Sequence, residues 1–401
     1  MLVEFSVGNY LSFKNKVTLS MAAGTVKEYA EHIIPTIDPK VSLLKSAVIY
    51  GANASGKSNL IKSLKFMRDF VLESAGTQIT QLIPVIKYLF STESDKIPSV
   101  FEIVFIIKDV FYKYGFEVDS DKVRKEYLSA YPKKRERKYF NRDDAGIQVG
   151  KYFSEGKGLE KKTRPNSLFL SYCAQNNGAV SGGILKWFSK IDFLDNNNYD
   201  YNIGFALMLN DMLRDSNIKA DVLKLLAITD LQIKDIVQEF IMNGKAYYFT
   251  TLHTKYNDKN MRVEDVKLGL EYESEGTKKI IKYSVPIIKK LLNGGILIID
   301  DMNAMLHTII SKELVKLFNN NDKNAQFVIT THDTNLLDKR YFRRDQIWFT
   351  EKDQYGATDL YSLIEFKIDK KNDDYYERDY IKGRYGAIPF LVDFSKLFSE
   401  D

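Results

Sequence analysis

The chain has 401 residues, enough for two or three domains, and 44% of them are hydrophobic, which is sufficient for a large buried core. The formal net charge of +5 permits contact with nucleic acid without requiring it, and the single cysteine excludes an internal disulfide. Because no run of 18 or more uncharged apolar residues and no signal-peptide pattern occur, we expect a cytoplasmic protein without a membrane span.

The first residues predict two strands. Residues 2–13 and 16–20 are rich in β-branched and aromatic residues and are separated by a polar turn. Pro35 and Pro39 then indicate an irregular loop that ends before residue 47.

The most specific motif of the chain follows this loop. Ala47–Tyr50 is a short apolar run that predicts a buried strand, and residues 59–71 carry apolar side chains at helical spacing. Between them, Gly51-Ala-Asn-Ala-Ser-Gly-Lys-Ser58 fits the pattern G-x-x-x-x-G-K-[ST]. In such a strand–loop–helix unit, backbone N–H groups and the helix dipole bind phosphates. The sequence therefore predicts a nucleoside triphosphate site in which Lys57 reaches the β- and γ-phosphates and Ser58 binds Mg²⁺.

A hairpin and a charged segment come next. Residues 100–107 and 111–118 alternate around a short polar link and predict a β-hairpin. The segment 124–142 contains the basic run Lys133-Lys-Arg-Glu-Arg-Lys138 among aromatic residues. It predicts either a DNA or RNA contact, through phosphate neutralisation and stacking, or a solvated hairpin whose aromatic residues cover the core.

The region from about 160 to 265 predicts mostly helix, for example over 203–213 and 220–226. Asn- and Asp-rich breaks interrupt it at 195–202 and 257–260. We therefore expect residues 119–265 to form an insertion with a basic hairpin and a helical region. The two parts of the core would be residues 1–118 and 266–401.

Further candidate functional residues follow residue 268. Ser274-Glu-Gly-Thr277 leads into an amphipathic helix that we expect to end at Asn293-Gly-Gly295. Ile296–Asp301 is an apolar run that ends in two carboxylates, which is the pattern of a buried strand that delivers acids to a Mg²⁺-nucleotide.

Four further elements complete the pattern. Residues 312–318 predict a helix, and Gln326–His332 predicts a second buried strand with a histidine at its carboxyl end. Residues 346–350 and 358–363 predict a closing pair of strands.

The order of these motifs resembles that of ABC-type ATPases, and more closely their SMC/RecF-like branch. There the phosphate loop reads Gly-x-Asn-x-Ser-Gly-Lys-Ser-Asn, which Gly51–Asn59 matches throughout. More narrowly, the chain is similar to prokaryotic ATPases of the AAA/OLD-like (overcoming lysogenisation defect) group, which is associated with phage defence and abortive infection. Three stretches carry this narrower resemblance: Phe5-x-x-x-Asn9-Tyr-x-Ser12-Phe13, Ser274-Glu-Gly-Thr277, and a tail over 343–352, 358–363 and 383–389. The resemblance is weak across residues 120–265.

The resemblance implies an α/β fold, namely an ABC-type ATPase with a mixed sheet, a P-loop core and a largely helical insertion domain. It implies that ATP is held by Gly51, Asn53, Ala54, Ser55, Gly56, Lys57, Ser58 and Asn59.

Further roles follow from the same resemblance. Ser58 and Asp300 would bind Mg²⁺. Asp301 stands where the family places the glutamate that polarises the attacking water, and His332 matches the switch histidine at the γ-phosphate, so both are candidate catalytic residues. Ser274 and Gly276 match the signature that contacts the γ-phosphate of a second subunit, which implies an ATP-dependent homodimer or higher oligomer.

The sequence also departs from the family pattern. Asp301 is one methylene shorter than the usual glutamate, and Met302–His307 lacks the acid and the serine that normally follow. A glutamine of the Q-loop has no counterpart at Tyr88–Ser91, the corresponding region. We therefore expect slow ATP hydrolysis. His307 is expected to pack or cap, and His32 and His253 have no metal-type spacing.

The resemblance supports three functions. The favoured one is an ATPase that acts as an ATP-gated sensor or switch in antiviral, abortive-infection-type defence with a separate effector protein. The alternative is a DNA-repair or DNA-clamp ATPase of the RecF/SMC kind; without a long heptad run we expect no coiled-coil arm. A self-contained OLD-type nuclease is disfavoured, because residues 333–401 leave little room for a Toprim domain and Asp373-Asp374 lies in a Lys/Asp-rich loop.

Overall fold

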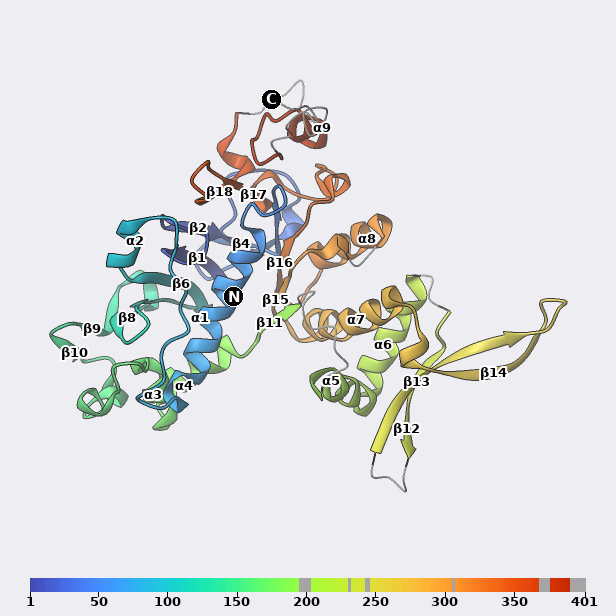
Figure 1. Ribbon diagram of the computed structural model, residues 1–401, viewed down its shortest axis with the longest axis horizontal. Helices are drawn as coiled ribbons and strands as arrows, with labels where there is room; N and C mark the ends of the chain where they lie inside the picture. Colours follow the sequence, from blue (N-terminus) through green and yellow to red (C-terminus); the bar gives the residue numbers. More distant parts are fainter. Residues whose placement is uncertain (195–202, 230–231, 242–245, 305–306, 368–375, 390–401) are drawn as a thin grey trace, which may run out of the picture.

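The computed structural model describes residues 1–194, 203–229, 232–241, 246–304, 307–367 and 376–389. Two large sheets and the helices around them form the body of the molecule, and a smaller sheet projects from it (Figure 1). The expected α/β fold with a mixed sheet is therefore confirmed. The break expected at 195–202 and the pair Asp373-Asp374 lie outside the described residues.

A seven-stranded antiparallel sheet contains the first strands of the chain, in the order β10-β9-β8-β7-β6-β1-β2. Its strands are β1 (Leu2–Gly8), β2 (Val17–Ser20), β6 (Ser99–Ile107), β7 (Val110–Val118), β8 (Val123–Tyr131), β9 (Arg137–Asp143) and β10 (Gly146–Val149). The two strands and the hairpin expected from the sequence are all present. Because β8 pairs with β7, the sheet continues across residue 118. The division of the chain into domains stays a prediction.

The second large sheet has six strands in the order β11-β15-β16-β5-β17-β18. They are β5 (Ser46–Tyr50), β11 (Ile191–Leu194), β15 (Gly295–Ile299), β16 (Ala325–Thr330), β17 (Ile347–Lys352) and β18 (Thr358–Ser362). The first five are parallel, and β18 is antiparallel to β17. Every residue of β5 and β16 is buried, which explains why these strands are rich in apolar residues and do not alternate between apolar and polar ones. The carboxyl ends of β5, β15 and β16 meet at one edge of this sheet.

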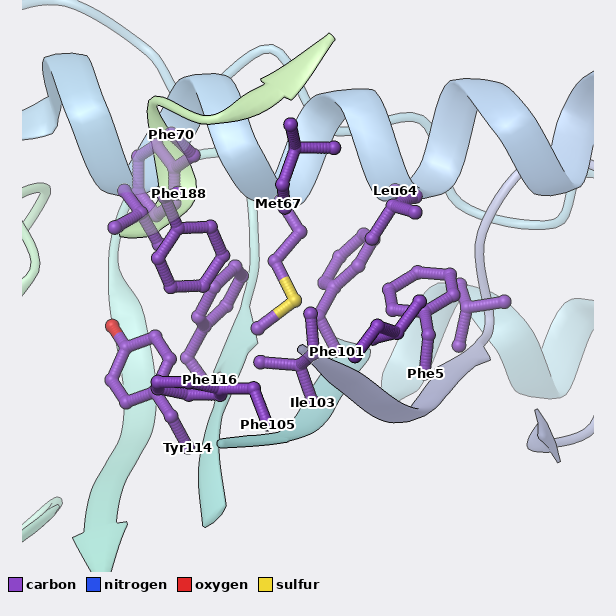
Figure 2. Close-up of a cluster of buried hydrophobic side chains, with 14 of the residues drawn as sticks. Phe5, Leu64, Met67, Phe70, Phe101, Ile103, Phe105, Tyr114, Phe116 and Phe188 are labelled. Atoms are coloured by element: carbon purple, nitrogen blue, oxygen red, sulfur yellow. The ribbon is translucent and has the colours of Figure 1, made fainter. Parts of the chain in front are cut away.

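Helix α1 (Lys57–Glu73) packs between the two sheets. Figure 2 shows Leu64, Met67 and Phe70 directed toward the aromatic side chains of β6 and β7, among them Phe101 and Phe116. The same buried cluster includes residues of β5, β15 and β16. The cluster also contains residues of α3 (Phe169–Gln175) and α4 (Ala179–Phe188). The phosphate loop is thus fixed by a helix that both sheets hold.

The other face of the six-stranded sheet is covered by a second buried cluster. Its helices are α5 (Ile203–Arg214), α6 (Ser216–Ile228), α7 (Glu275–Asn293), α8 (Thr308–Asn319) and α9 (Tyr376–Ile381). The helices expected over 203–213, 220–226 and 312–318, and the one after Ser274, are present. Helix α7 continues through Pro286 and ends before Gly294, whose φ of 71° is in the left-handed region.

Part of the helical expectation for 160–265 is wrong. β12 (Asp235–Ile241), β13 (Ala246–Tyr256) and β14 (Arg262–Gly269) form an antiparallel three-stranded sheet that projects from the body (Figure 1). Most of β14 is exposed on both faces, so its sequence lacks the alternation of apolar and polar residues that marks a half-buried strand. Smaller elements, β3 (Ile33–Pro35), β4 (Ser42–Leu44) and α2 (Thr92–Lys96), complete the fold. Within the described ranges, no helix has the length and apolar character needed to cross a bilayer.

Candidate nucleotide-binding site

The phosphate loop joins the buried strand β5 to the N-terminus of α1. Gly56 precedes the helix with a φ of 117°, and a Cβ atom at this residue would collide with Thr358 of β18. Ser55 is held from the same side, since its Oγ lies 2.7 Å from Thr350 Oγ1 and its carbonyl oxygen lies 2.8 Å from Thr358 Oγ1. The closing strands β17 and β18 therefore shape the loop, and only glycine fits at position 56.

The tail of the chain also reaches this loop. The backbone N–H of Ala52 donates to the carbonyl oxygen of Ala387 at 3.0 Å. The same carbonyl accepts the Tyr380 hydroxyl at 2.9 Å, and the Ala387 N–H donates to Glu351 Oε1 at 3.2 Å. The segment 383–389, noted in the sequence for its resemblance, thus supports the first residues of the loop.

A pocket of about 520 Å³ opens above the loop. Its lining residues are Asn53, Ala54, Ser55, Gly56, Lys57, Ser58, Asn59, Asp300, Asp301, Thr330, His332 and Lys352. The structure therefore brings together the loop, the two carboxylates after β15 and the histidine after β16, which are distant in the sequence. Gly51 lies at the base of the loop, where a Cβ atom would meet Ser55 and Thr350.

Lys57 extends over the loop from the first residue of α1. Its Nζ donates to the carbonyl oxygens of Gly51 at 2.7 Å and Ala52 at 2.9 Å. Burial lowers the pKa of the Lys57 ammonium from its ordinary value, and the nearby carboxylates of Asp301 and Asp300 oppose that shift. A cation at a helix N-terminus, beside converging backbone N–H groups, is a suitable environment for a polyphosphate.

The two carboxylates are held by Thr330, the last residue of β16. Its hydroxyl donates to Asp300 Oδ1 at 2.5 Å and accepts the backbone N–H of Asp301 at 2.7 Å. Asp301 has a φ of 56°, a left-handed conformation that aspartate and asparagine tolerate better than most residues. Its Oδ1 is buried and has no hydrogen-bond partner within the described part of the chain. A buried carboxylate oxygen without a partner is costly, so the polar group nearest to this atom matters for the site.

His332 lies next to this unpaired oxygen. Its Nδ1 is 3.2 Å from Asp301 Oδ1, a close approach that is not aligned for a hydrogen bond. On its other side, its Nε2 lies 2.7 Å from Asn303 Nδ2. Asp301 and His332 both line the pocket, and the His332 side chain is about half exposed.

Asn303, Thr330 and Lys352 are residues of this site that sequence reasoning missed. Lys352 ends β17 and lines the pocket, where it adds a second cation. Asn303 could have been suspected from its position two residues after Asp301, within the stretch 302–307 that lacks the acid and the serine of the family pattern. No sequence signal marks Lys352, because its place depends on the pairing of β17 with β5.

The residues present fit Mg²⁺. This ion prefers oxygen ligands and is usually held by one or two carboxylates together with substrate phosphates. The Ser58 hydroxyl and the Asp300 carboxylate supply such oxygens in the same pocket, beside the unsatisfied oxygen of Asp301.

The signature residues lie elsewhere. Ser274 caps α7, since its Oγ accepts the Thr277 N–H at 3.1 Å. Ser274 and Gly276 are exposed and are not among the residues that line the pocket. The N-terminus of α7 is therefore exposed and does not contribute to the pocket of its own chain.

The remaining histidines have structural contacts. His307 caps α8 by accepting the Ile309 N–H at 3.3 Å, as expected. His32 stacks on Tyr29, and His253 lies 2.7 Å from Glu273 Oε1. The basic hairpin is β8–β9: Tyr139 and Phe140 are buried, whereas the run 133–138 is exposed.

Comparisons with known proteins agree with the broad expectation. Residues 46–338 match the model of a family with the description "AAA domain, putative AbiEii toxin, Type IV TA system". No curated protein matches the chain. The narrower AAA/OLD-like assignment stays a prediction.

Solved structures give remote likenesses. The SMC head domain from Thermotoga maritima has a TM-score of 0.42 at 10% identity, with 92% of this chain and 99% of that chain covered. An SmcHead bound to the C-winged helix domain of ScpA has a TM-score of 0.46 at 11% identity, with coverage of 90% and 97%. An Smc head domain from Pyrococcus furiosus, bound to the C-terminal domain of ScpA, has a TM-score of 0.41 at 10% identity, with coverage of 90% and 96%. Because the family match spans well over half of the residues, this chain belongs to this AAA domain family.

Proposed function

We propose that this protein binds ATP with Mg²⁺, hydrolyses it slowly as an ABC-type ATPase, and acts as an ATP-gated switch in antiviral, abortive-infection-type defence with a separate effector. One observation carries the ATPase part of this proposal. The phosphate loop, Lys57, two carboxylates and His332 converge on one pocket although they come from three different strand ends.

Each group in the pocket has a task in phosphoryl transfer. The loop N–H groups and Lys57 bind the phosphates, and Lys57 exchanges its two carbonyl partners for phosphate oxygens. Ser58 and Asp300 are the residues that would hold Mg²⁺, which when bound neutralises phosphate charge. The Asp301 carboxylate lines the pocket and can orient a water molecule. Such a site works by positioning and charge neutralisation.

Loss of Lys57 tests nucleotide binding. A charge-assisted hydrogen bond contributes roughly 1.5–3 kcal/mol, and about 1.4 kcal/mol corresponds to a tenfold change in affinity. We therefore expect Lys57→Ala to weaken binding of a fluorescent ATP analogue at least about tenfold. Lys62→Ala, an exposed lysine of the same helix outside the pocket, is the matched control and should bind like the wild type. Equal affinity in Lys57→Ala and Lys62→Ala would refute the site.

The defence role rests on the family description, which names a toxin of a type IV TA system, and on the sequence resemblance. It is tested by phage challenge of cells that carry the gene with its native neighbours. We expect protection that Lys57→Ala abolishes and Lys62→Ala retains. Equal plaque counts with and without the locus, over a panel of phages, would argue against the defence role and leave the ATPase assignment intact.

A second candidate, a DNA-clamp or DNA-repair ATPase of the RecF/SMC kind, is favoured by one observation. The turn of the β8–β9 hairpin exposes a predominantly basic run, 133–138, where β8 ends and β9 begins. Phosphate neutralisation by such a run is the usual source of sequence-independent DNA affinity.

A further inference from the structure

The side-chain amide of Asn303 connects the loop after β15 with the loop after β16. Its Oδ1 lies 2.7 Å from Thr331 Oγ1 and 3.1 Å from the backbone nitrogen of His332. Its Nδ2 lies 2.7 Å from Nε2 of the His332 ring. Asn303 therefore contacts both the backbone and the ring of the same histidine.

The backbone contact fixes which end of the amide faces the ring. A backbone N–H can only donate, so the atom that faces the His332 nitrogen must be the amide oxygen. The Thr331 hydroxyl donates to that oxygen as well. The NH₂ group of Asn303 is thereby directed at the ring, and it has no lone pair that could accept a hydrogen bond.

This orientation determines where the ring carries its proton. Because the amide NH₂ donates to Nε2, that nitrogen must be the unprotonated, accepting one, and the proton of the neutral ring resides on Nδ1. A proton on Nε2 would place two donors face to face at 2.7 Å. We infer that Asn303 is a positioning residue that holds His332 as the Nδ1–H tautomer, with this N–H beside Oδ1 of Asp301.

This tautomer gives Asp301 and His332 different roles in the site. The Nε2 lone pair of His332 is occupied by Asn303, so in this arrangement the ring offers a donor and no acceptor to the pocket. Its Nδ1–H lies 3.2 Å from the buried carboxylate oxygen that lacks a hydrogen bond. Asp301 is then the proton-accepting group, and His332 stabilises charge. This statement about catalysis rests on the proposed ATPase function, whereas the position of the ring proton does not.

Nitrogen NMR of the ring measures this proton directly. The chain contains four histidines, so a two-bond ¹H–¹⁵N spectrum of the full chain with ¹⁵N-labelled histidine is readily assigned, His332 by the signals lost in His332→Gln. At pH 8, above the ordinary histidine pKa of about 6.5, the rings of free histidine favour the Nε2–H tautomer. We expect His332 to show a protonated Nδ1 and an unprotonated Nε2.

Two other histidines serve as internal references in the same spectrum. His307 accepts a backbone N–H at Nδ1, so its neutral ring carries the proton on Nε2. His32 has the opposite form: its Nδ1 lies 3.1 Å from Gln346 Oε1, and that oxygen is fixed as the acceptor by the Arg343 N–H at 2.9 Å. The two references mark the signals expected for each tautomer.

Variants of Asn303 give the decisive comparison. In Asn303→Asp a carboxylate replaces the NH₂ donor, so Nε2 should become protonated. In Asn303→Ala the amide donor is lost, and Nε2–H should appear in part of the population, because the Asp301 carboxylate 3.2 Å from Nδ1 still favours a proton there. Asn141→Asp, which adds the same charge on an exposed residue of β9, should leave the His332 signals unchanged. Signals of His32 and His307 report that each variant is folded.

The inference is overturned by a wild-type His332 with a protonated Nε2, or by a ring in Asn303→Asp that keeps Nε2 unprotonated. If the wild type hydrolyses ATP, Asn303→Ala should lower steady-state phosphate release about tenfold, because His332 is no longer held in place, with little change in ATP affinity. A wild type that binds no ATP but shows the expected ring signals would refute the proposed function and leave the role of Asn303 intact.

Discussion

In the proposed ATPase, Asp301 is the residue on which we expect the rate of hydrolysis to depend most. A carboxylate that orients a water molecule must lie within about 2.6–3.2 Å of it, and misplacement by about 1 Å can reduce the rate on the order of 100-fold. Asp301 is one methylene shorter than the glutamate that the resemblance to ABC-type ATPases implies at this position. Asp301 has a left-handed backbone conformation, and its Oδ1 is buried without a hydrogen-bond partner among the described residues.

We predict that Asp301→Glu raises steady-state phosphate release, because the longer side chain brings the carboxylate closer to the water, while ATP affinity changes little. The left-handed φ of 56° is less suitable for glutamate than for aspartate, so the variant should also unfold at a slightly lower temperature. Asp301→Asn keeps the shape and the preference for this backbone conformation but removes the base, and it should abolish turnover while retaining ATP binding. A wild type that turns over many ATP molecules per second, and that glutamate slows, would show that aspartate is already well placed.

At the scale of single elements, the N-terminus of α7 is the feature that the pocket of its own chain does not use. Ser274 and the exposed N–H groups that follow lie at the positive end of a 19-residue helix. Such an end binds anions, and the ATP phosphate of a second copy is the anion that the ATPase proposal provides.

We therefore predict that ATP promotes self-association and that Ser274→Arg abolishes this effect, since a bulky cation would occupy the place of the partner's phosphate. ATP binding by the monomer should remain, because Ser274 does not line the pocket of its own chain. Light scattering with and without ATP is the measurement. Ser216→Arg, at the exposed N-terminus of α6, is the matched control and should still assemble. Association that is complete without ATP and indifferent to both variants would contradict the proposed role of α7.

The β8–β9 hairpin makes a second prediction at this scale. If its basic turn binds nucleic acid phosphates, replacement of Lys133, Lys134, Arg135 and Arg137 by alanine should weaken DNA or RNA binding and flatten its salt dependence by about 0.9 per lost phosphate contact on a log–log plot. Replacement of four exposed lysines elsewhere, Lys224, Lys255, Lys259 and Lys267, gives the same change in net charge and should leave the salt dependence steep. Absence of binding by the wild type at low salt would leave the solvated hairpin as the correct interpretation. The ion pair of Lys134 with Asp38 at 2.7 Å already gives this turn a structural contact.

For the whole molecule, the sequence predicted those elements that are determined by residues within a single segment. The phosphate loop, the buried strands and α7 were predicted because local periodicity and helix-capping residues determine them. It failed for β12–β14, because most of β14 is exposed on both faces and lacks the alternation of a half-buried strand. It also failed for Asn303 and Lys352, whose roles depend on which strands become neighbours. Strand order is decided by contacts between residues far apart in the chain, which no local pattern encodes.

One such long-range contact joins the two large sheets. Gln326 of β16 is completely buried. Its Oε1 accepts the Leu2 N–H at 2.6 Å, and its Nε2 donates to the carbonyl oxygens of Leu2 at 3.0 Å and Leu44 at 3.2 Å. These backbone groups belong to β1 and β4. The Gln326 side chain of β16 therefore supplies the hydrogen bonds that they would otherwise form with a neighbouring strand. Gln326 does not line the nucleotide pocket.

We predict that Gln326→Met lowers the free energy of unfolding by roughly 3 kcal/mol, since it leaves a buried N–H and two buried carbonyl oxygens without partners. Gln238→Met, the same change in the projecting sheet on a partly exposed residue, should cost much less. Differential scanning calorimetry with and without ATP measures both effects. ATP at about 100 times its Kd should stabilise wild type and Gln326→Met alike, by about 2.7 kcal/mol, because the ligand binds only the folded state and its pocket is retained. Loss of the ATP effect in Gln326→Met, at a temperature where the variant is folded, would mean that the junction of the sheets also shapes the nucleotide site.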